Sequence, residues 1–144
     1  MSKRILIVDD QRDVRRVLRA GLEALKQDLT IVEVPSGEEG MLVLSRQAID
    51  LLILDVRLPG ISGLELQQRA RQRNPNLKLI LITGMTDDAV RRQVSEAGVE
   101  AFFFKPVDMS NFLETVQRCL GIQAAAQPPA DVPQTVFPQK PASD

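Results

Sequence analysis

Five short runs of apolar residues divide the first 105 positions of the chain. They lie at 5–8, 29–34, 51–54, 77–82 and 101–104. Most of these runs are continuous rather than alternating, which is typical of strands that are covered on both faces in a parallel sheet. The second run contains Thr30 and Glu33, so we expect that strand at an edge of the sheet.

Segments with helical periodicity separate the runs. The first of them places its small and apolar residues on one stripe, at Val14, Val17, Leu18, Gly21, Leu22 and Leu25. Ser36 is suited to cap the second helix. A further helix is expected over 86–96, and the last one begins at Asp108 or Ser110 and ends at Gly121.

This alternation gives five β-α units and predicts an α/β fold. Right-handed crossovers place helices on both faces of a doubly wound, five-stranded parallel sheet. In such sheets the functional site lies at the carboxyl ends of the strands. Four of the five runs end in polar residues, which we expect to meet at one edge: Asp9 with Asp10, Asp55, Thr83 and Lys105.

The composition argues against several classes of function and location. With 144 residues the chain is long enough for one domain, and its net charge of -1 offers no electrostatic footprint for nucleic acid or for an anionic membrane. No apolar stretch approaches the roughly 20 residues of a membrane helix. The single cysteine, Cys119, fits a reducing compartment and is expected to be a small core residue. We therefore expect a cytoplasmic protein.

The composition changes after residue 122. Residues 123–144 contain five of the nine prolines together with alanine and glutamine, and no apolar period. We expect a domain over 1–122 and a disordered tail or linker over 123–144. This tail resembles a cut linker more than a natural end, which favours a fragment of a longer regulator.

The chain has no histidine. It cannot carry phosphohistidine itself, offer an imidazole base or build a usual zinc site. It also has no tryptophan or tyrosine, so stacking on nucleic-acid bases is limited to five phenylalanines.

The acidic residues at the strand ends point to a metal. Carboxylates of Asp9, Asp10 and Asp55 in one crevice would repel each other, and a hard divalent cation such as Mg²⁺ would remove that penalty. The simpler interpretation is that Asp9 or Asp10 only caps the following helix, but a cap does not require two acids. The three residues therefore predict a partly built Mg²⁺ site.

Asp55 ends the most uniformly apolar run, and a carboxylate there can act as a nucleophile and form an acyl phosphate. Phosphoryl transfer depends chiefly on positioning and charge. Thr83 supplies a hydroxyl and Lys105 a compact positive charge for the phosphoryl oxygens. A cis bond before Pro106 would be one way to aim the lysine inward.

These residues make the chain resemble the receiver domain of two-component response regulators. The resemblance covers residues 3 to about 121 and is carried by Ile5-Leu6-Ile7-Val8-Asp9-Asp10, Leu54-Asp55-Val56-Arg57-Leu58-Pro59-Gly60 with Gly63, Ile82-Thr83-Gly84 and Phe104-Lys105-Pro106. It implies a flavodoxin-like (β/α)5 fold with strand order 2-1-3-4-5. It also implies a phosphorylation switch in two-component or phosphorelay signalling.

The resemblance also implies roles for the site residues. Asp55 would receive a phosphoryl group from the phosphohistidine of a histidine kinase or a histidine phosphotransfer protein. Mg²⁺, for which Mn²⁺ can substitute, would be bound by Asp10, Asp55 and the backbone carbonyl of Arg57, with Asp9 helping through water. Thr83 and Lys105 would contact the phosphoryl oxygens.

The output is implied in the same way. Recruitment of Thr83 would pull on the helix expected over 86–96, and Phe102 would fill the vacated space as a rotamer switch. The partner or homodimer face of the family is formed by that helix, the strand 101–104 and the last helix. This face would control an output domain or a downstream protein, with no direct contact to nucleic acid or membrane.

Two departures from the family pattern are visible. Phe102 stands where a tyrosine is frequent and has no hydroxyl to offer a partner. Arg57 and Met85 occupy the variable positions beside the phosphoryl group, and Met85 cannot orient an attacking water. We therefore expect no unusually rapid self-dephosphorylation.

Three alternatives remain at this point. A haloacid-dehalogenase-like phosphatase would need an acid two residues after Asp55, where the chain has Arg57. A flavodoxin-type cofactor binder would want a phosphate loop rich in Ser, Thr and Gly where Asp9 and Asp10 stand. A pseudo-receiver would keep the fold as an interaction module without phosphorylation. We expect no enzyme activity beyond the chain's own phosphorylation and dephosphorylation.

Overall fold

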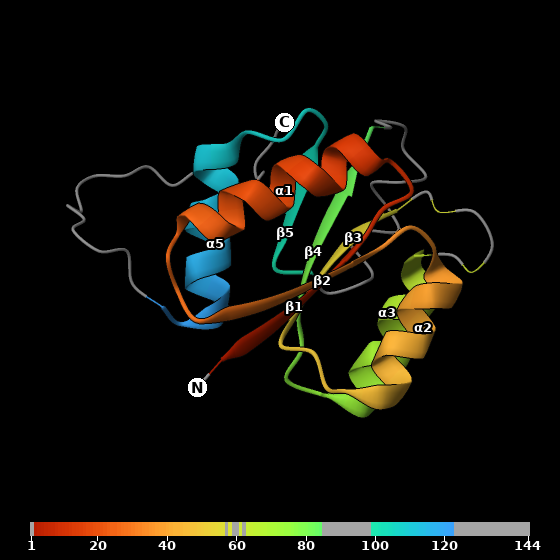
Figure 1. Cartoon of the computed structure of the whole chain (residues 1–144). Coiled ribbons are helices and arrows are strands. Elements are labelled where there is room, and N and C mark those ends of the chain that lie inside the picture. The colour runs from red at the N-terminus through yellow and green to blue at the C-terminus, as the bar shows by residue number, and fades with distance from the viewer. Residues whose placement is uncertain (1, 57, 59–60, 62, 85–98, 123–144) are drawn as a thin grey trace.

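The computed structural model of the chain describes residues 2–56, 58, 61, 63–84 and 99–122 (Figure 1). Its strands are β1 Lys3–Val8, β2 Leu29–Val34, β3 Leu51–Asp55, β4 Lys78–Thr83 and β5 Ala101–Phe104. Its helices are α1 Arg12–Ala24, α2 Gly37–Arg46, α3 Gly63–Arg73 and α5 Met109–Leu120. The helix expected over 86–96 and the tail over 123–144 lie outside the described residues.

The five strands form one parallel sheet in the order β2-β1-β3-β4-β5, as the resemblance implied. The predicted doubly wound α/β fold is confirmed. β2 lies at an edge, as its polar residues indicated, and most of its side chains are only partly buried. The apolar residues of the central strands β1, β3 and β4 are almost fully buried, because helices cover both faces of the sheet.

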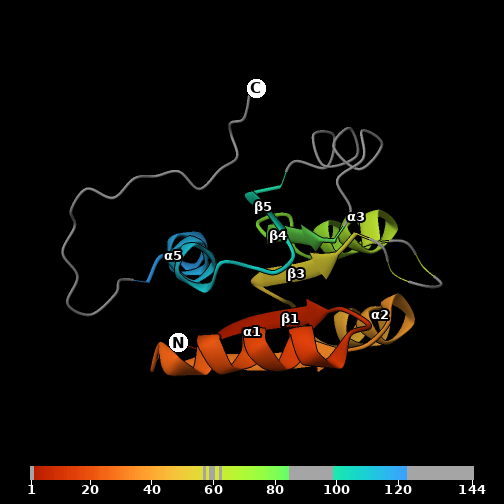
Figure 2. The same ribbon diagram turned by 90° about the horizontal axis from the view of Figure 1, so that it is seen from above.

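The sheet separates two hydrophobic cores. Its leucines Leu6, Leu52 and Leu79 pack with α2 and α3, whereas its isoleucines Ile7 and Ile53 pack with α1 and α5. In Figure 1, α1 and α5 lie on one side of the strands and α2 and α3 on the other, and Figure 2 shows α5 and α3 on opposite sides of β3 and β4. Successive strand residues alternate between the faces, so each continuous apolar run supplies both cores.

The helix ends follow the local sequence. The Ser36 hydroxyl accepts a hydrogen bond from the backbone N–H of Glu39 at 3.2 Å, as predicted. Asp108 caps α5 by accepting from the backbone N–H of Asn111 at 3.2 Å, and Gly121 ends that helix with a φ of 69°. The left-handed backbone at this last position favours glycine.

Register brings the strand ends together at one edge. Val8 pairs with Leu54, so Asp9 and Asp55 follow neighbouring positions of β1 and β3. Asp55 in turn pairs with Ile82, next to Thr83. No helix in the described part of the chain is long and apolar enough to cross a membrane.

Candidate functional site

Three carboxylates converge at the carboxyl edge of the sheet. Ligand oxygens of Asp9, Asp10 and Asp55 all lie within 4.8 Å of one another. Asp9 and Asp55 are buried, with 0% and 5% of their surface exposed, while Asp10 is exposed. Like charges this close repel strongly in a poorly solvated site, so the arrangement requires compensating cations.

The ammonium group of Lys105 supplies positive charge beside these carboxylates. Its Nζ lies 2.8 Å from Asp55 Oδ2 and 3.0 Å from Asp9 Oδ2, and it also donates a hydrogen bond of 2.6 Å to Gln11 Oε1. The backbone N–H of Lys105 donates to the carbonyl of Thr83 at 2.9 Å, which fixes the residue to the end of β4. The Lys105–Pro106 peptide bond is cis.

The pKa values of Asp9 and Lys105 reflect this crowding. Burial raises the pKa of Asp9 above its usual value, and the hydrogen bond from the Gln11 backbone N–H together with the nearby Lys105 ammonium offsets only part of that effect. Burial alone would lower the pKa of Lys105, but its hydrogen bond to Asp55 and its close contacts with the charges of Asp55 and Asp9 outweigh burial and raise that pKa. The lysine therefore stays positively charged at neutral pH.

The chemistry of the donor set fits a hard divalent cation. All three side chains offer oxygen ligands, which Mg²⁺ prefers. Asp9 Oδ2 is buried and accepts no hydrogen bond of good geometry from any residue that the structure describes, although the Lys105 ammonium is near. A buried carboxylate oxygen without a hydrogen bond costs free energy that a bound cation would recover.

Thr83 and Phe102 lie on the same face of the sheet. Thr83 is fully buried at the end of β4, and Phe102 pairs with Leu81, two residues before it. Phe102 is partly buried, and its ring makes a T-shaped contact with that of Phe104, with the centroids 4.9 Å apart. Both predicted switch residues are therefore near the carboxyl edge, whereas Arg57 lies outside the described residues.

The structure adds residues around the first loop that the pattern did not indicate. Arg15 Nη1 donates to the carbonyl oxygen of Asp9 at 2.7 Å, and Arg15 Nε forms an ion pair with Glu33 of β2 at 3.1 Å. Asp9 Oδ1 accepts the backbone N–H of Gln11 at 2.8 Å. The loop that carries Asp9 and Asp10 is thus held by Arg15 and by the hydrogen bond between Asp9 and Gln11. Only the polar character of Glu33 within an apolar run could have hinted at this contact.

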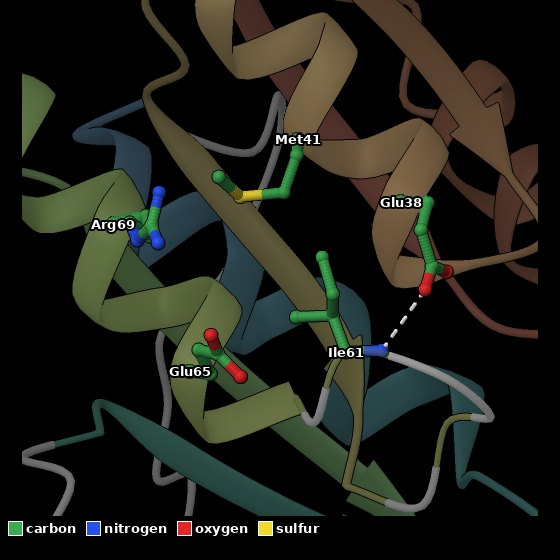
Figure 3. Close-up of a pocket in the computed structure, with 5 residues that line it drawn as sticks. All are labelled: Glu38, Met41, Ile61, Glu65 and Arg69. Carbon is green, nitrogen blue, oxygen red and sulfur yellow. Dashed lines mark hydrogen bonds between the residues drawn. The ribbon is translucent and has the colours of Figure 1, made fainter.

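The loop between β3 and α3 is anchored to α2. The carboxylate of Glu38 accepts the backbone N–H of Ile61 at 3.2 Å, a contact that Figure 3 shows beside a cavity of about 270 Å³ between α2 and α3. A side chain at Gly37 would come within 2.8 Å of the Ile61 carbonyl oxygen, and one at Gly63 within 2.8 Å of the Asp55 carbonyl oxygen. Both glycines are required because backbone lies where a Cβ would be.

The fold and the site together define a class, the CheY-like proteins. A receiver domain protein described as CheY-like from Methanospirillum hungatei JF-1 superposes with a TM-score of 0.74 and 29% identity, over 84% of this chain and 95% of that one. A putative response regulator from Chloroflexus aurantiacus J-10-fl also gives 0.74 and 29%, over 84% and 99%.

The family follows from the sequence. Residues 5–117 match the response regulator receiver domain, and the chain belongs to that family. This membership places it in two-component signal transduction, and receiver domains bind Mg²⁺ at an acidic pocket of this kind.

The relatives range from about the length of this chain to several times its length. The chain is 36% identical over 125 residues to the transcriptional activator protein ExaE of Pseudomonas putida, covering 87% of this chain and 58% of that protein. It is 26% identical to the sporulation initiation phosphotransferase F of Bacillus subtilis, covering 86% of this chain and 98% of that one. The chain spans 24% and 29% of the regulators HoxA of Cupriavidus necator and PilR of Pseudomonas aeruginosa.

Proposed function

We propose that Asp55 accepts a phosphoryl group from the phosphohistidine of a histidine kinase or a histidine phosphotransfer protein. One observation carries this proposal: Lys105 Nζ lies 2.8 Å from a buried carboxylate, Asp55, that forms a group with Asp9 and Asp10. A purely structural domain gains nothing from burying acids so close together. This observation favours a working switch over a pseudo-receiver.

The transfer is one displacement at phosphorus. An oxygen of Asp55 forms a bond to phosphorus while the bond to the donor's imidazole nitrogen breaks, and the electron pair of that bond stays on the nitrogen. Mg²⁺, or Mn²⁺ in its place, would neutralise charge on the phosphoryl oxygens when held by Asp10, Asp55 and the backbone carbonyl of Arg57, with Asp9 helping through water. The product is an acyl phosphate at the sheet edge.

Lys105 and Thr83 stabilise that product. The lysine already lies within hydrogen-bond distance of Asp55 Oδ2, so only a short shift moves its ammonium to a phosphoryl oxygen. The hydroxyl of Thr83 turns inward to another oxygen, and Phe102 follows as the rotamer switch. The signal then passes to β5 and α5, which contact an output domain, a downstream partner or a second copy; the segment 86–96, expected to share this role, lies outside the described residues.

The phosphohistidine of the proposed donor lies outside these 144 residues, because they contain no histidine. An apolar hollow of about 210 Å³ lies directly beside the lysine, lined by Asp13, Val14, Val17, Leu18, Lys105, Pro106 and Val107. Val17 is 53% exposed there. We assign this hollow to the donor protein, which must approach Asp55 from this edge.

Acetyl phosphate tests the phosphorylation without any partner. With Mg²⁺ the chain should gain one phosphoryl group that hydroxylamine removes, and Asp55→Asn should abolish the gain. Asp50→Asn is the matched control, since Asp50 precedes the same strand at the opposite edge and an asparagine there still accepts the Arg4 N–H. A wild-type chain that resists both acetyl phosphate and phosphorylated kinases would leave the pseudo-receiver as the better interpretation.

The donor surface has its own test. Val17→Glu should slow transfer from the cognate kinase by about tenfold, because a buried unpaired charge at an interface costs more than about 1.4 kcal/mol. The rate with acetyl phosphate should not change. Leu42→Glu, at an equally exposed leucine on α2, is the matched control and should affect neither rate.

The same family membership suggests the remaining context. We propose that residues 1–122 form the receiver domain and that 123–144 link it to further sequence, since several relatives are much longer than this chain. We also propose that the protein acts in the cytoplasm, where histidine kinases present their phosphohistidine.

A further inference from the structure

Gln11 occupies the N-cap position of α1 but does not cap it. The backbone at Gln11 is extended, and its side chain makes no capping hydrogen bond. Serine, threonine, aspartate and asparagine are the residues that normally fill this position, and glutamine is not among them. Asp9 Oδ1 accepts the backbone N–H of Gln11 instead, at 2.8 Å, so the side chain of Gln11 is available for another contact.

That contact is with Lys105. Gln11 Oε1 accepts a hydrogen bond of 2.6 Å from Lys105 Nζ across the carboxyl edge of the sheet. An ammonium group has three N–H donors. Among the described residues, Lys105 Nζ donates to Asp55 Oδ2 at 2.8 Å and to Gln11 Oε1, and it forms an ion pair with Asp9 Oδ2 at 3.0 Å. The glutamine therefore completes the set of partners that fixes the position of the ammonium.

The three partners of the ammonium differ in what the proposed reaction does to them. Asp55 and Asp9 are acids of the metal site, and Asp55 is also the proposed nucleophile, so both exchange the lysine for other partners when the site is loaded. Gln11 is neutral and neither reacts nor competes strongly for a cation. It is the one acceptor that can keep its bond to Lys105 before and after transfer.

We propose that Gln11 is a positioning residue that holds the Lys105 ammonium at the phosphoryl position throughout the cycle. This inference rests on the proposed phosphorylation of Asp55. The amide suits the task because it orients the lysine without adding charge. A glutamate at this place would add a fourth carboxylate and hold the ammonium away from the phosphoryl oxygens.

A double-mutant cycle tests this role. Gln11→Met keeps a similar chain length without an acceptor, and it should slow phosphorylation by phosphoramidate in saturating Mg²⁺ about fivefold. In a Lys105→Met background the same change should have no further effect, because its target is gone. Gln68→Met, at an exposed glutamine on α3, should leave the rate unchanged in both backgrounds.

A second readout requires no phosphorylation. Without Mg²⁺, Gln11→Met should lower the midpoint of urea unfolding in the wild-type background but not in the Lys105→Met background. An equal loss in both backgrounds, or no loss of rate in the wild-type background, would overturn the role of Gln11 while phosphorylation of Asp55 stands. A wild-type chain that takes no phosphoryl group would overturn both proposals together. Gln11→Asn, whose amide is shorter, should recover only part of the rate.

Discussion

Asp10 offers the sharpest test of the acidic cluster, because two opposing electrostatic effects meet at this exposed residue. At an effective dielectric constant of about 20, two unit charges 4.8 Å apart repel by about 3.5 kcal/mol. Asp10 faces two such neighbours, but Lys105 neutralises part of their charge and solvent screens the exposed carboxylate. We therefore take the net repulsion as about 1.5 kcal/mol.

The helix dipole acts in the other direction. Asp10 lies just before α1, where a negative charge gains about 0.5 kcal/mol. Repulsion wins, so Asp10→Asn should stabilise the metal-free protein by about 1 kcal/mol and raise its melting temperature by about 4 °C. The same change should remove most of the stabilisation by Mg²⁺, which for the wild-type chain reaches about 2.7 kcal/mol at a hundredfold excess over Kd.

Thermal and urea unfolding, each with EDTA and with about 10 mM Mg²⁺ to saturate the site, measure the stability of the metal-free protein and its stabilisation by Mg²⁺. Asp13→Asn is the matched control, since Asp13 lies in the first turn of α1 outside the acidic group and should lose stability slightly. A lower melting temperature for metal-free Asp10→Asn, or an undiminished Mg²⁺ effect, would refute the electrostatic reasoning.

Three further predictions concern the surrounding contacts. Because burial raises the pKa of Asp9, its negative charge destabilises the metal-free fold at neutral pH, and Asp9→Asn should be more stable than the wild-type chain there. Urea unfolding at several pH values should show this advantage shrink as the pH falls through the raised pKa, and vanish below the unfolded-state pKa of 3.8. Glu38→Ala should weaken Mg²⁺ binding about threefold by calorimetry, whereas Glu38→Gln, which keeps an acceptor for the loop, should restore it. Gly63→Ala should cost about 2 kcal/mol in urea unfolding, because its Cβ would meet the Asp55 carbonyl, whereas Gly84→Ala should cost little.

Much of the fold could be predicted because its signals are local. A continuous apolar run gives a strand covered on both faces, and Ser36 and Asp108 cap helices through hydrogen bonds to residues three positions on. Parallel strands also force Asp9, Asp10 and Asp55 to the same edge. The strand order required the family resemblance, since alternation of strands and helices does not by itself choose it.

The remaining contacts join side chains that are distant in sequence. Arg15 reaches Glu33, Glu38 reaches the backbone of Ile61, and Gln11 reaches Lys105. No periodicity or spacing encodes such pairs, because each depends on how helices sit against strand ends. The polar side chains of Arg15 and Glu38 are what the exposed side of any helix would show.

Cys119 was expected to be a small core residue, and the structure agrees in part. The thiol is half-buried against the α1–α5 core. Burial raises its pKa to about 11, and the negative charge of Glu100 adds to this effect. A thiol with this pKa is almost wholly protonated at neutral pH and therefore a poor nucleophile.

The two cores have no side chain in common among the described residues, because the backbone of the sheet stands between them. Substitutions in one layer should therefore be energetically additive with those in the other. The layer beneath the donor hollow can diversify to recognise a new kinase while the α2–α3 layer is left unchanged. Such independence would let related chains in one cell acquire separate partners without rebuilding their shared chemistry.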